Sequence, residues 1–384
     1  MKRICLIFEF PPEADFQLRS VMETLKNKNP GDEVYCLHGF LKNYRPGGRS
    51  PSRVLNLLWM YCLLPIHLLL KRPSWILVRS APPGIQVWCS LWAHLFKIPT
   101  IAWIMDYHPE IEIRALEQRA LFRPGAKILR QIDRIALNQL HGAIVLDDAM
   151  LNTVKQQAPN LDIQVHPTWD QYAEQENVPQ NGSQGPNNNK LLFVYAGNLS
   201  SHHPLETFER LLQSLSKQSP ETEIELHVIG TSNKGEERFR LLAQRGPIQL
   251  HITQRIPFHA LKQRLVELNP HYGIVLMDEK TAGLFSPSKF AGYLSAGIPL
   301  LYCGPPKTNA DKICQDFHAG ISLPARTPET TMENLALEMT QAETIQGYQK
   351  GVIQAYQYFT GYNARTFANQ LSSMIHSTPH EAAL

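Results

Sequence analysis

Short apolar runs with strand composition alternate with amphipathic stretches along most of the chain, and this alternation is the feature that most restricts its fold. In the first half, the apolar runs are Ile4–Phe8, Val34–Leu37, Trp75–Val78, Thr100–Ile104 and Ala143–Leu146. Strands separated by helices pair in parallel, because the crossover helix returns the chain to the same end of the sheet. The pattern therefore predicts an α/β protein built from doubly wound parallel sheets.

The chain is long enough for two domains. Its 384 residues exceed one ordinary hydrophobic core. A polar run rich in Gly, Pro and Asn occupies 175–190, and the alternation resumes at Leu191. We predict an N-terminal domain over 1–172, a linker over 173–190, a C-terminal domain over 191–345 and a final helical segment over 346–384.

Cysteine usage and the N-terminus indicate a cytoplasmic protein. The first strand-like run follows Met1-Lys2-Arg3, and Glu9 ends it too early for a signal peptide. The cysteines form no CxxC pair and no metal-ligand spacing, so we interpret them as buried thiols of a reducing compartment. They are Cys5, Cys36, Cys62, Cys89, Cys303 and Cys314.

The segment from Val34 to Met105 is basic and rich in tryptophan. It contains no Asp or Glu, eight Lys or Arg, and five of the six Trp. Its uncharged part, Val54–Leu70, fits three descriptions: a transmembrane helix, a buried helix of an α/β domain, or an interfacial helix on a membrane. Basic residues interleaved with long aliphatic runs favour lipid over nucleic acid. We expect peripheral binding to the anionic inner face of a membrane, and no nucleic-acid partner.

Four strand-to-helix junctions of the second half suit an anionic ligand. "VYAGNL" ends a strand at Gly197, "LHVIG" ends one at Gly230, and "ITQRIP" places Arg255 at a strand end. The fourth, "FSPSKFAGYLSAGIPLL", offers a proline-containing helix start with Ser286, Ser288 and Lys289. Free amides at a helix start, together with a lysine, stabilise phosphate charge.

In this order, the four junctions resemble the C-terminal half of the retaining family-four glycosyltransferases, which have the GT-B fold. In the first half, "GDEVYCL" and "AWIMDYHPE" resemble that family's second strand and cleft-facing region. The resemblance implies two Rossmann-like domains facing a cleft, with the C-terminal helix crossing back to the first domain. It also implies transfer of a sugar from a nucleotide diphosphate-sugar to a glycan or lipid-linked acceptor, with retention. No cofactor or metal is expected, because nothing resembles the DxD metal motif.

The resemblance also suggests roles for individual residues. His108 and Asp106, after the fourth strand, would be catalytic, unless His108 only caps the next helix. Glu9 and Glu13 would lie on the acceptor side, where they and Asp15 are the alternative base if the enzyme inverts. The donor site would comprise Gly197, Asn198, His203, Gly230, Arg255, Glu279, Ser286, Ser288 and Lys289.

The chain departs from the family where the donor ribose should bind. The family's ribose-binding glutamate falls at Gly292 and its partner at Leu284, while Glu279 lies upstream. The glycine either admits a different donor or marks a site that has lost catalysis. Two other functions therefore stay open: an inactive GT-B protein that acts as a binding or scaffold subunit, and a nucleotide-sugar epimerase.

Overall fold

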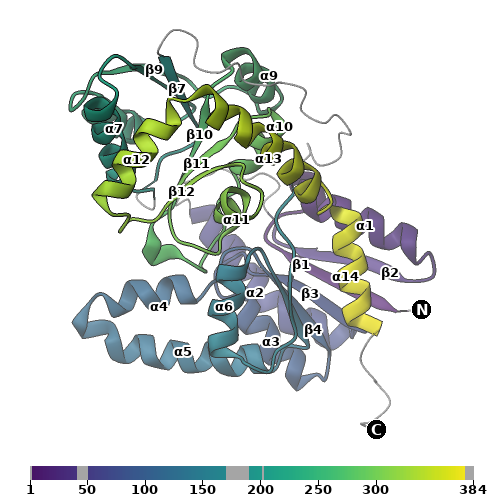
Figure 1. Ribbon diagram of the computed structural model, residues 1–384. Coiled ribbons are helices and arrows are strands. Elements are labelled where there is room, and N and C mark those ends of the chain that lie inside the picture. The colour runs from purple at the N-terminus through teal and green to yellow at the C-terminus, as the bar shows by residue number, and fades with distance from the viewer. Residues whose placement is uncertain (1, 41–50, 170–189, 201–202, 377–384) are drawn as a thin grey trace. The chain divides into compact units, whose positions relative to one another are not determined.

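The computed structural model describes residues 2–40, 51–169, 190–200 and 203–376, which form two compact units. The first unit comprises 1–171, 283–286 and 362–384, and the second comprises 172–282 and 287–361. Apart from Lys190, the predicted linker over 173–190 lies outside the described residues. Each unit contains one six-stranded parallel sheet with helices packed on it (Figure 1).

The sheet of the first unit has the strand order β2-β1-β3-β4-β5-β6. Its strands are β1 (Arg3–Phe8), β2 (Glu33–His38), β3 (Trp75–Arg79), β4 (Thr100–Ile104), β5 (Gly142–Val145) and β6 (Ile163–Val165). The helices of this unit are α1 (Phe16–Lys28), α2 (Pro51–Lys71), α3 (Ile85–Leu95), α4 (Glu110–Glu117), α5 (Arg123–Asn138), α6 (Asp148–Gln157) and α14 (Ala364–His376), with 3₁₀ turns η1 (Pro12–Ala14) and η2 (Ala120–Phe122).

The sheet of the second unit has the order β12-β11-β10-β7-β8-β9. Its strands are β7 (Lys190–Ala196), β8 (Glu223–Ile229), β9 (Ile248–Thr253), β10 (Tyr272–Leu276), β11 (Leu300–Cys303) and β12 (Gly320–Leu323). The helices are α7 (Glu206–Gln218), α8 (Asn233–Ala243), α9 (Phe258–Leu268), α10 (Phe290–Ser295), α11 (Asn309–Asp316), α12 (Glu329–Met339) and α13 (Ala342–Thr360), with the 3₁₀ turn η5 (Glu279–Thr281).

These elements form where sequence periodicity and capping agree. β4 and β5 are buried at every residue, as expected for central strands of a sheet covered on both faces. The Asp15 carboxylate caps α1 by accepting the Leu18 N–H, at 3.0 Å, and Asp147 caps α6 in the same way. The predicted fold class is therefore confirmed in both halves of the chain.

The last helix of the chain belongs to the first unit, as the resemblance implies. α14 packs beside α1, where the Lys28 ammonium donates to the Asn369 side chain at 3.0 Å (Figure 1). The Phe367 ring packs on Trp103, with the ring centres 4.4 Å apart. α13 stays in the second unit, so the chain returns at Tyr362 rather than at residue 346. The first unit also takes up Gly283–Ser286, which sequence analysis did not predict.

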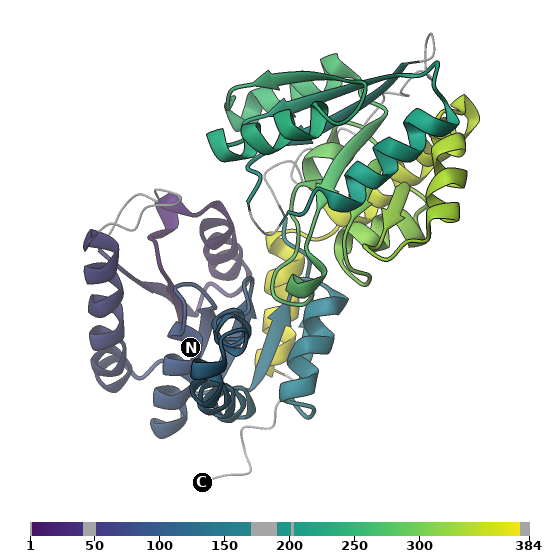
Figure 2. The same ribbon diagram turned by 90° about the vertical axis from the view of Figure 1, so that its left-hand side faces the viewer.

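α2 combines features of the buried and the interfacial descriptions. Val54–Lys71 is long and apolar enough to cross a membrane, with a mean hydropathy of 1.6 and 22% of the segment buried. One face of α2 nevertheless packs into the first core through Met60, Leu64 and Leu68. α2 therefore serves as the crossover helix between β2 and β3, and it lies on the outside of its unit, at the left of Figure 2.

Candidate functional site

The predicted donor residues of the second unit gather at one edge of its sheet. Gly197 follows β7, Gly230 follows β8, Arg255 follows β9 and Glu279 follows β10. All six strands are parallel, so their carboxyl ends share this edge. The strand order reverses between β7 and β10, and doubly wound sheets bind ligands outside the strand ends at such a point.

Lys289 and Gly197 meet at this reversal point. Gly197 has a φ of 108°, in the region that favours glycine, and a Cβ there would lie 3.1 Å from the Lys289 Cε. The Lys289 ammonium lies 5.3 Å from the centre of the Tyr195 ring. Below it, the Tyr293 hydroxyl accepts the Ala196 N–H at 2.8 Å and fixes the end of β7. A cation and a glycine loop thus lie side by side at the sheet edge.

The protein does little to stabilise the positive charge on the Lys289 ammonium. Burial lowers the pKa of Lys289 to about 8, and among the described residues no carboxylate forms an ion pair with it. A cation held in poor hydration gains more from a bound anion than an exposed one does. Lys289 therefore has the electrostatics of a ligand-binding residue.

The helix expected to start around Ser286–Lys289 begins later than predicted. α10 begins at Phe290, Lys289 occupies the N-cap position, and no side chain caps the helix. The serines before it are therefore not N-caps of α10, which corrects that expectation. The residues before it make other contacts instead: Phe285 forms an antiparallel bridge with Asp106, and the Leu284 carbonyl accepts the Tyr107 N–H at 2.7 Å. Ser286 follows the bridged Phe285, and Ser288 is exposed just before α10.

The described residues of the loop after β7 form hydrogen bonds with one another and with residues that follow β8. The exposed Asn198 accepts the Ser232 N–H on its side-chain oxygen, at 3.2 Å. The His203 ring accepts the Ser200 N–H at 3.0 Å, and Arg238 donates to the carbonyls of both Ser200 and His203. In this structure His203 holds the shape of the loop.

Arg255 is exposed beside a second glycine. Gly230 has a φ of 74°, and a Cβ there would lie 3.3 Å from the Arg255 Cα. Glu279 points its carboxylate to the loop after β12, where it accepts the Ala325 N–H at 2.8 Å. Gly292 faces open space, because a Cβ added to it would meet no atom within 4 Å. Packing therefore does not require glycine at the position of the family's glutamate.

His108 in the first unit is oriented by a carboxylate that sequence analysis missed. Its Nδ1 lies 2.6 Å from the Glu112 Oε1, one turn later on α4. This contact leaves Nε2 as the nitrogen available to a ligand. His108 does not cap α4, because Pro109 occupies the N-cap and makes no side-chain cap bond. The neighbouring Asp106 is exposed, and its N–H donates to the Ser80 hydroxyl at 3.3 Å.

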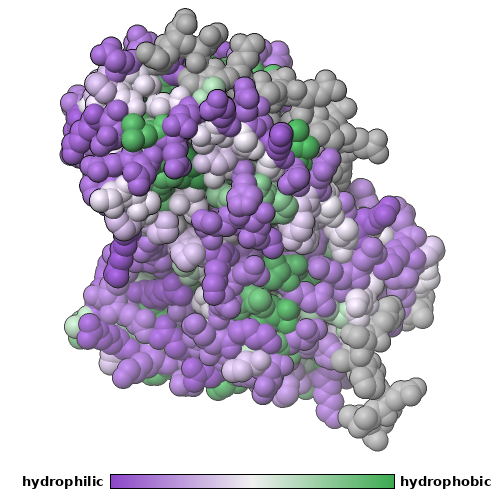
Figure 3. All heavy atoms as spheres, in the orientation of Figure 1, coloured by the Kyte–Doolittle hydropathy of each residue, from purple (hydrophilic) through white to green (hydrophobic). Residues whose placement is uncertain are grey.

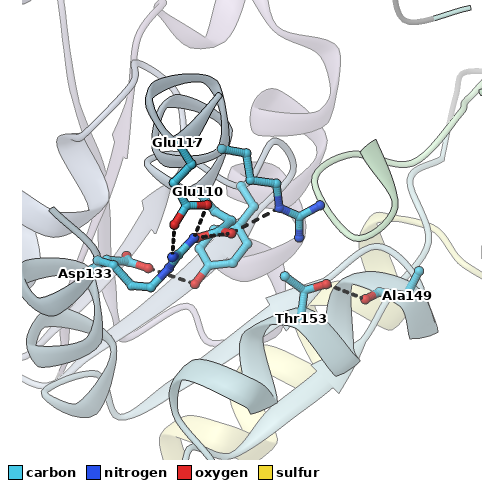
Figure 4. A network of polar contacts seen from close by, with 8 residues as sticks. Glu110, Glu117, Asp133, Ala149 and Thr153 are labelled. Carbon is cyan, nitrogen blue, oxygen red and sulfur yellow. Dashed lines mark hydrogen bonds and ion pairs between the residues drawn. The ribbon is translucent and has the colours of Figure 1, made fainter. Parts of the chain in front are cut away.

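A buried polar network supports this strand end (Figure 4). Between Asp106 and His108, the Tyr107 hydroxyl donates to the Asp133 Oδ2 at 2.8 Å. Burial raises the pKa of Asp133 to about 7, while the Tyr107 bond opposes this shift and the charge of Glu110 adds to it. Glu110 is itself buried and pairs with Arg130, at 3.1 Å. The network fixes α4 and α5 to the end of β4.

The acceptor-side acids occupy different environments. Glu9 is buried after β1, whereas Glu13 is exposed in η1. Asp15 forms an ion pair with Arg79 in addition to capping α1, so it is engaged in structure. The Arg79 guanidinium lies 5.5 Å and 5.4 Å from the ring centres of Phe8 and Trp103. Arg79 was missed as a site residue; the only signal was a charged residue ending a buried strand.

Comparison with solved structures identifies the fold of this chain. A sucrose-phosphate synthase from Thermosynechococcus elongatus superposes with a TM-score of 0.61 at 12% identity, over 98% of this chain and 99% of its own. The chain has the GT-B fold. WaaG, a glycosyltransferase involved in lipopolysaccharide biosynthesis, gives 0.58 at 13% identity over 98% and 100% of the two chains. The galactosyltransferase WaaB of the lipopolysaccharide outer core superposes with a TM-score of 0.57 at 14% identity, over 98% of this chain and 99% of its own. No family model and no curated protein matches the chain.

Proposed function

We propose that this GT-B chain is a glycosyltransferase that moves a sugar from a nucleotide diphosphate-sugar to a glycan or lipid-linked acceptor, with retention. One observation carries the proposal: the poorly hydrated Lys289 lies against the glycine turn after β7, where the strand order reverses. A diphosphate is the ligand class that such a cation and such a turn suit. The fold neighbours named above include enzymes that use this architecture for glycosyl transfer.

The proposed mechanism depends mainly on positioning and electrostatics. When the bond between the sugar and the diphosphate breaks, negative charge grows on the leaving diphosphate, and Lys289 would neutralise part of it. The exposed Arg255 is a second cation at the same sheet edge. His108, oriented by Glu112, would accept a hydrogen bond or a proton from the attacking hydroxyl. No step in this proposal needs a metal ion.

Isothermal titration calorimetry with UDP-, GDP- and ADP-sugars tests the donor site. We expect one of these nucleotides to bind, and Lys289→Ala to weaken its binding by about tenfold or more, because a charge-assisted contact is worth about 1.5–3 kcal/mol. The exposed Lys217→Ala, at the end of α7, is the matched control and should bind as the parent does. Absence of binding at millimolar nucleotide would contradict the proposal, and equal binding by the Lys289 variant would remove Lys289 from the site.

An inactive binding protein is the second candidate, and the glycine at position 292 favours it. A Cβ added at this position would meet no atom within 4 Å, yet the chain carries no side chain there. Radiolabelled donor incubated with glycan and lipid-linked acceptors separates the possibilities. Labelled acceptor supports transfer, binding without product supports the inactive protein, and a change of the donor sugar without acceptor supports an epimerase.

We also propose that the first unit docks on an anionic membrane through the outer faces of α2 and α5. The α2 residues exposed on this face are apolar: Val54, Leu55, Leu58, Trp59, Ile66, Leu69 and Leu70. On α5, Ile128, Ile132 and Ile135 form an exposed stripe at helical spacing. α3 packs against both helices, so the two faces belong to one layer of the unit.

Basic residues in the same layer favour an anionic membrane as the binding partner. Exposed basic residues adjoin the apolar faces at Lys71, Arg72, Lys97, Arg123, Lys127 and Arg134. Aliphatic side chains flanked by Lys and Arg suit the headgroup boundary of an anionic bilayer, where each basic residue contributes about 1 kcal/mol. The face seen in Figure 3 is mostly hydrophilic, with smaller apolar groups. Docking on the inner leaflet would bring the enzyme to lipid-linked acceptors.

A further inference from the structure

A cluster of three potential metal ligands lies on two neighbouring strands of the second unit. In the parallel pairing of β8 with β9, His227 is the direct partner of His251. Glu225 precedes His227 by two residues, and side chains two apart on a strand point to the same face. The register therefore brings all three side chains together, although 26 positions separate Glu225 from His251.

The potential ligand atoms lie close together. The Glu225 Oε1 lies 2.7 Å from the His227 Nε2 and 3.1 Å from the His251 Nε2. One ligand atom from each residue lies within 4.8 Å of the others. Around a tetrahedral zinc ion, with ligand bonds of about 2.0–2.2 Å, such atoms lie about 3.3 Å apart. The two distances from the Glu225 Oε1 would therefore need to lengthen by only a few tenths of an ångström to admit an ion.

Two of the three potential ligands are buried, and the third is exposed to solvent. Glu225 and His227 are 7% and 8% exposed, while the side chain of His251 is 49% exposed. The two imidazole rings stack, with their centres 4.6 Å apart and an angle of 16° between their planes. This arrangement leaves the solvent side of His251 for ion entry and for a fourth ligand such as water.

Two neighbouring cations affect the electrostatics of the three potential ligands. The Lys190 ammonium pairs with the second carboxylate oxygen of Glu225, Oε2, so it fixes the carboxylate while Oε1 faces the imidazoles. Arg264 on α9 lies close enough to influence His227 electrostatically, and Glu267 partly balances its charge at 3.6 Å. Both cations lower the affinity for a metal ion without blocking the three ligand atoms.

We propose that Glu225, His227 and His251 bind one divalent transition-metal ion of the zinc type, which ties the edge strand β9 to β8. Two imidazoles and one carboxylate form a ligand set that zinc accepts, with an open fourth position. The site is separate from the proposed donor residues, although Gly230 and Arg255 follow the same two strands. Its role is to hold β9 in place, and the sugar-transfer proposal does not depend on it.

The test uses the full chain after removal of metal by a chelator. We expect calorimetry to give one Zn²⁺ per chain, and Co²⁺ to give the intense visible absorption of a tetrahedral site with nitrogen ligands. His251→Ala should weaken Zn²⁺ binding by at least about tenfold. The exposed His94→Ala on α3 is the matched control and should leave binding unchanged. Zn²⁺ should also raise the unfolding temperature of the parent protein but not that of the His251 variant.

Two results would overturn the proposal. The first is Zn²⁺ binding that His251→Ala and the milder His251→Gln both leave unchanged, since the ion would then sit elsewhere among the fifteen histidines. The second is the absence of a Co²⁺ spectrum in the parent protein, which needs no variant to fold. Circular dichroism of the metal-free variants verifies that they share the parent's secondary structure.

Discussion

Lys289 is the residue whose chemical state most directly affects the proposed donor site. Its pKa is lowered to about 8 by burial, from an ordinary value of 10.5. In the free protein it is therefore protonated below pH 8 and loses its charge progressively above that pH. A bound diphosphate favours the protonated form, so binding and protonation are coupled.

This coupling predicts a pH dependence of nucleotide binding. Above pH 8 the dissociation constant should rise by up to about tenfold per pH unit, because the free lysine must first take up a proton. Between pH 6.5 and 7.5 it should be nearly constant. Lys289→Arg is the control, since arginine stays protonated and its curve should be flat over the same range. Calorimetric titrations from pH 6.5 to 9.5 measure both curves, and identical slopes would show that Lys289 does not titrate in the site.

Some features of the candidate site were predicted from the sequence, and some side-chain contacts were not. The spacing of Gly197, Gly230 and Arg255 after their strands was enough to predict one shared edge, because parallel strands end together. The ion pair of Asp15 with Arg79 and the contact of His108 with Glu112 were not predicted. The first depends on which strands are neighbours, which local pattern does not reveal. The second has the i,i+4 spacing of one helical turn, a local signal that was not used.

At the scale of elements, α10 is the clearest difference between prediction and structure. The proline and serines before it satisfy every local rule for a helix start, yet the helix begins only at Phe290. The reason is tertiary, since Phe285 is bridged to Asp106 and Gly283–Ser286 belong to the first unit. The existence of most strands was easier to predict, because buried β runs differ strongly from their surroundings, whereas the strand order within each sheet was not predicted.

The glycine within α10 gives a prediction about stability. Gly292 lies in the helix, and an added Cβ would meet open space. Gly292→Ala should therefore stabilise the second unit by about 0.5–1 kcal/mol, since alanine loses less conformational entropy on helix formation. Thermal unfolding should show a higher midpoint. Gly197→Ala is the contrasting variant and should lower it, because its φ of 108° strains any other residue and the Cβ would press on Lys289. A destabilised Gly292→Ala would mean that the glycine has a packing role.

At the scale of the whole molecule, each of the two units has its own sheet and core. The units divide the chain between 171 and 172, at both ends of Gly283–Ser286, and between Gly361 and Tyr362. The helices α2, α3 and α5 belong entirely to the first unit, whereas Lys289 and most of the proposed donor residues belong to the second. Because α2 contributes Met60, Leu64 and Leu68 to the core, spanning the bilayer would expose that core. Peripheral docking keeps the fold intact.

Vesicle flotation tests this docking. The protein should float with vesicles containing phosphatidylglycerol and not with pure phosphatidylcholine, and high salt should release it because screening shortens the reach of the basic residues. The double variant Leu58→Asn with Ile128→Asn removes exposed apolar side chains from both helices and should reduce the floating fraction several-fold. Leu337→Asn, at an exposed position on α12 of the second unit, is the matched control and should float like the parent. Equal flotation with both vesicle types would contradict the charge argument, and resistance to salt and alkali together would indicate that α2 spans the membrane.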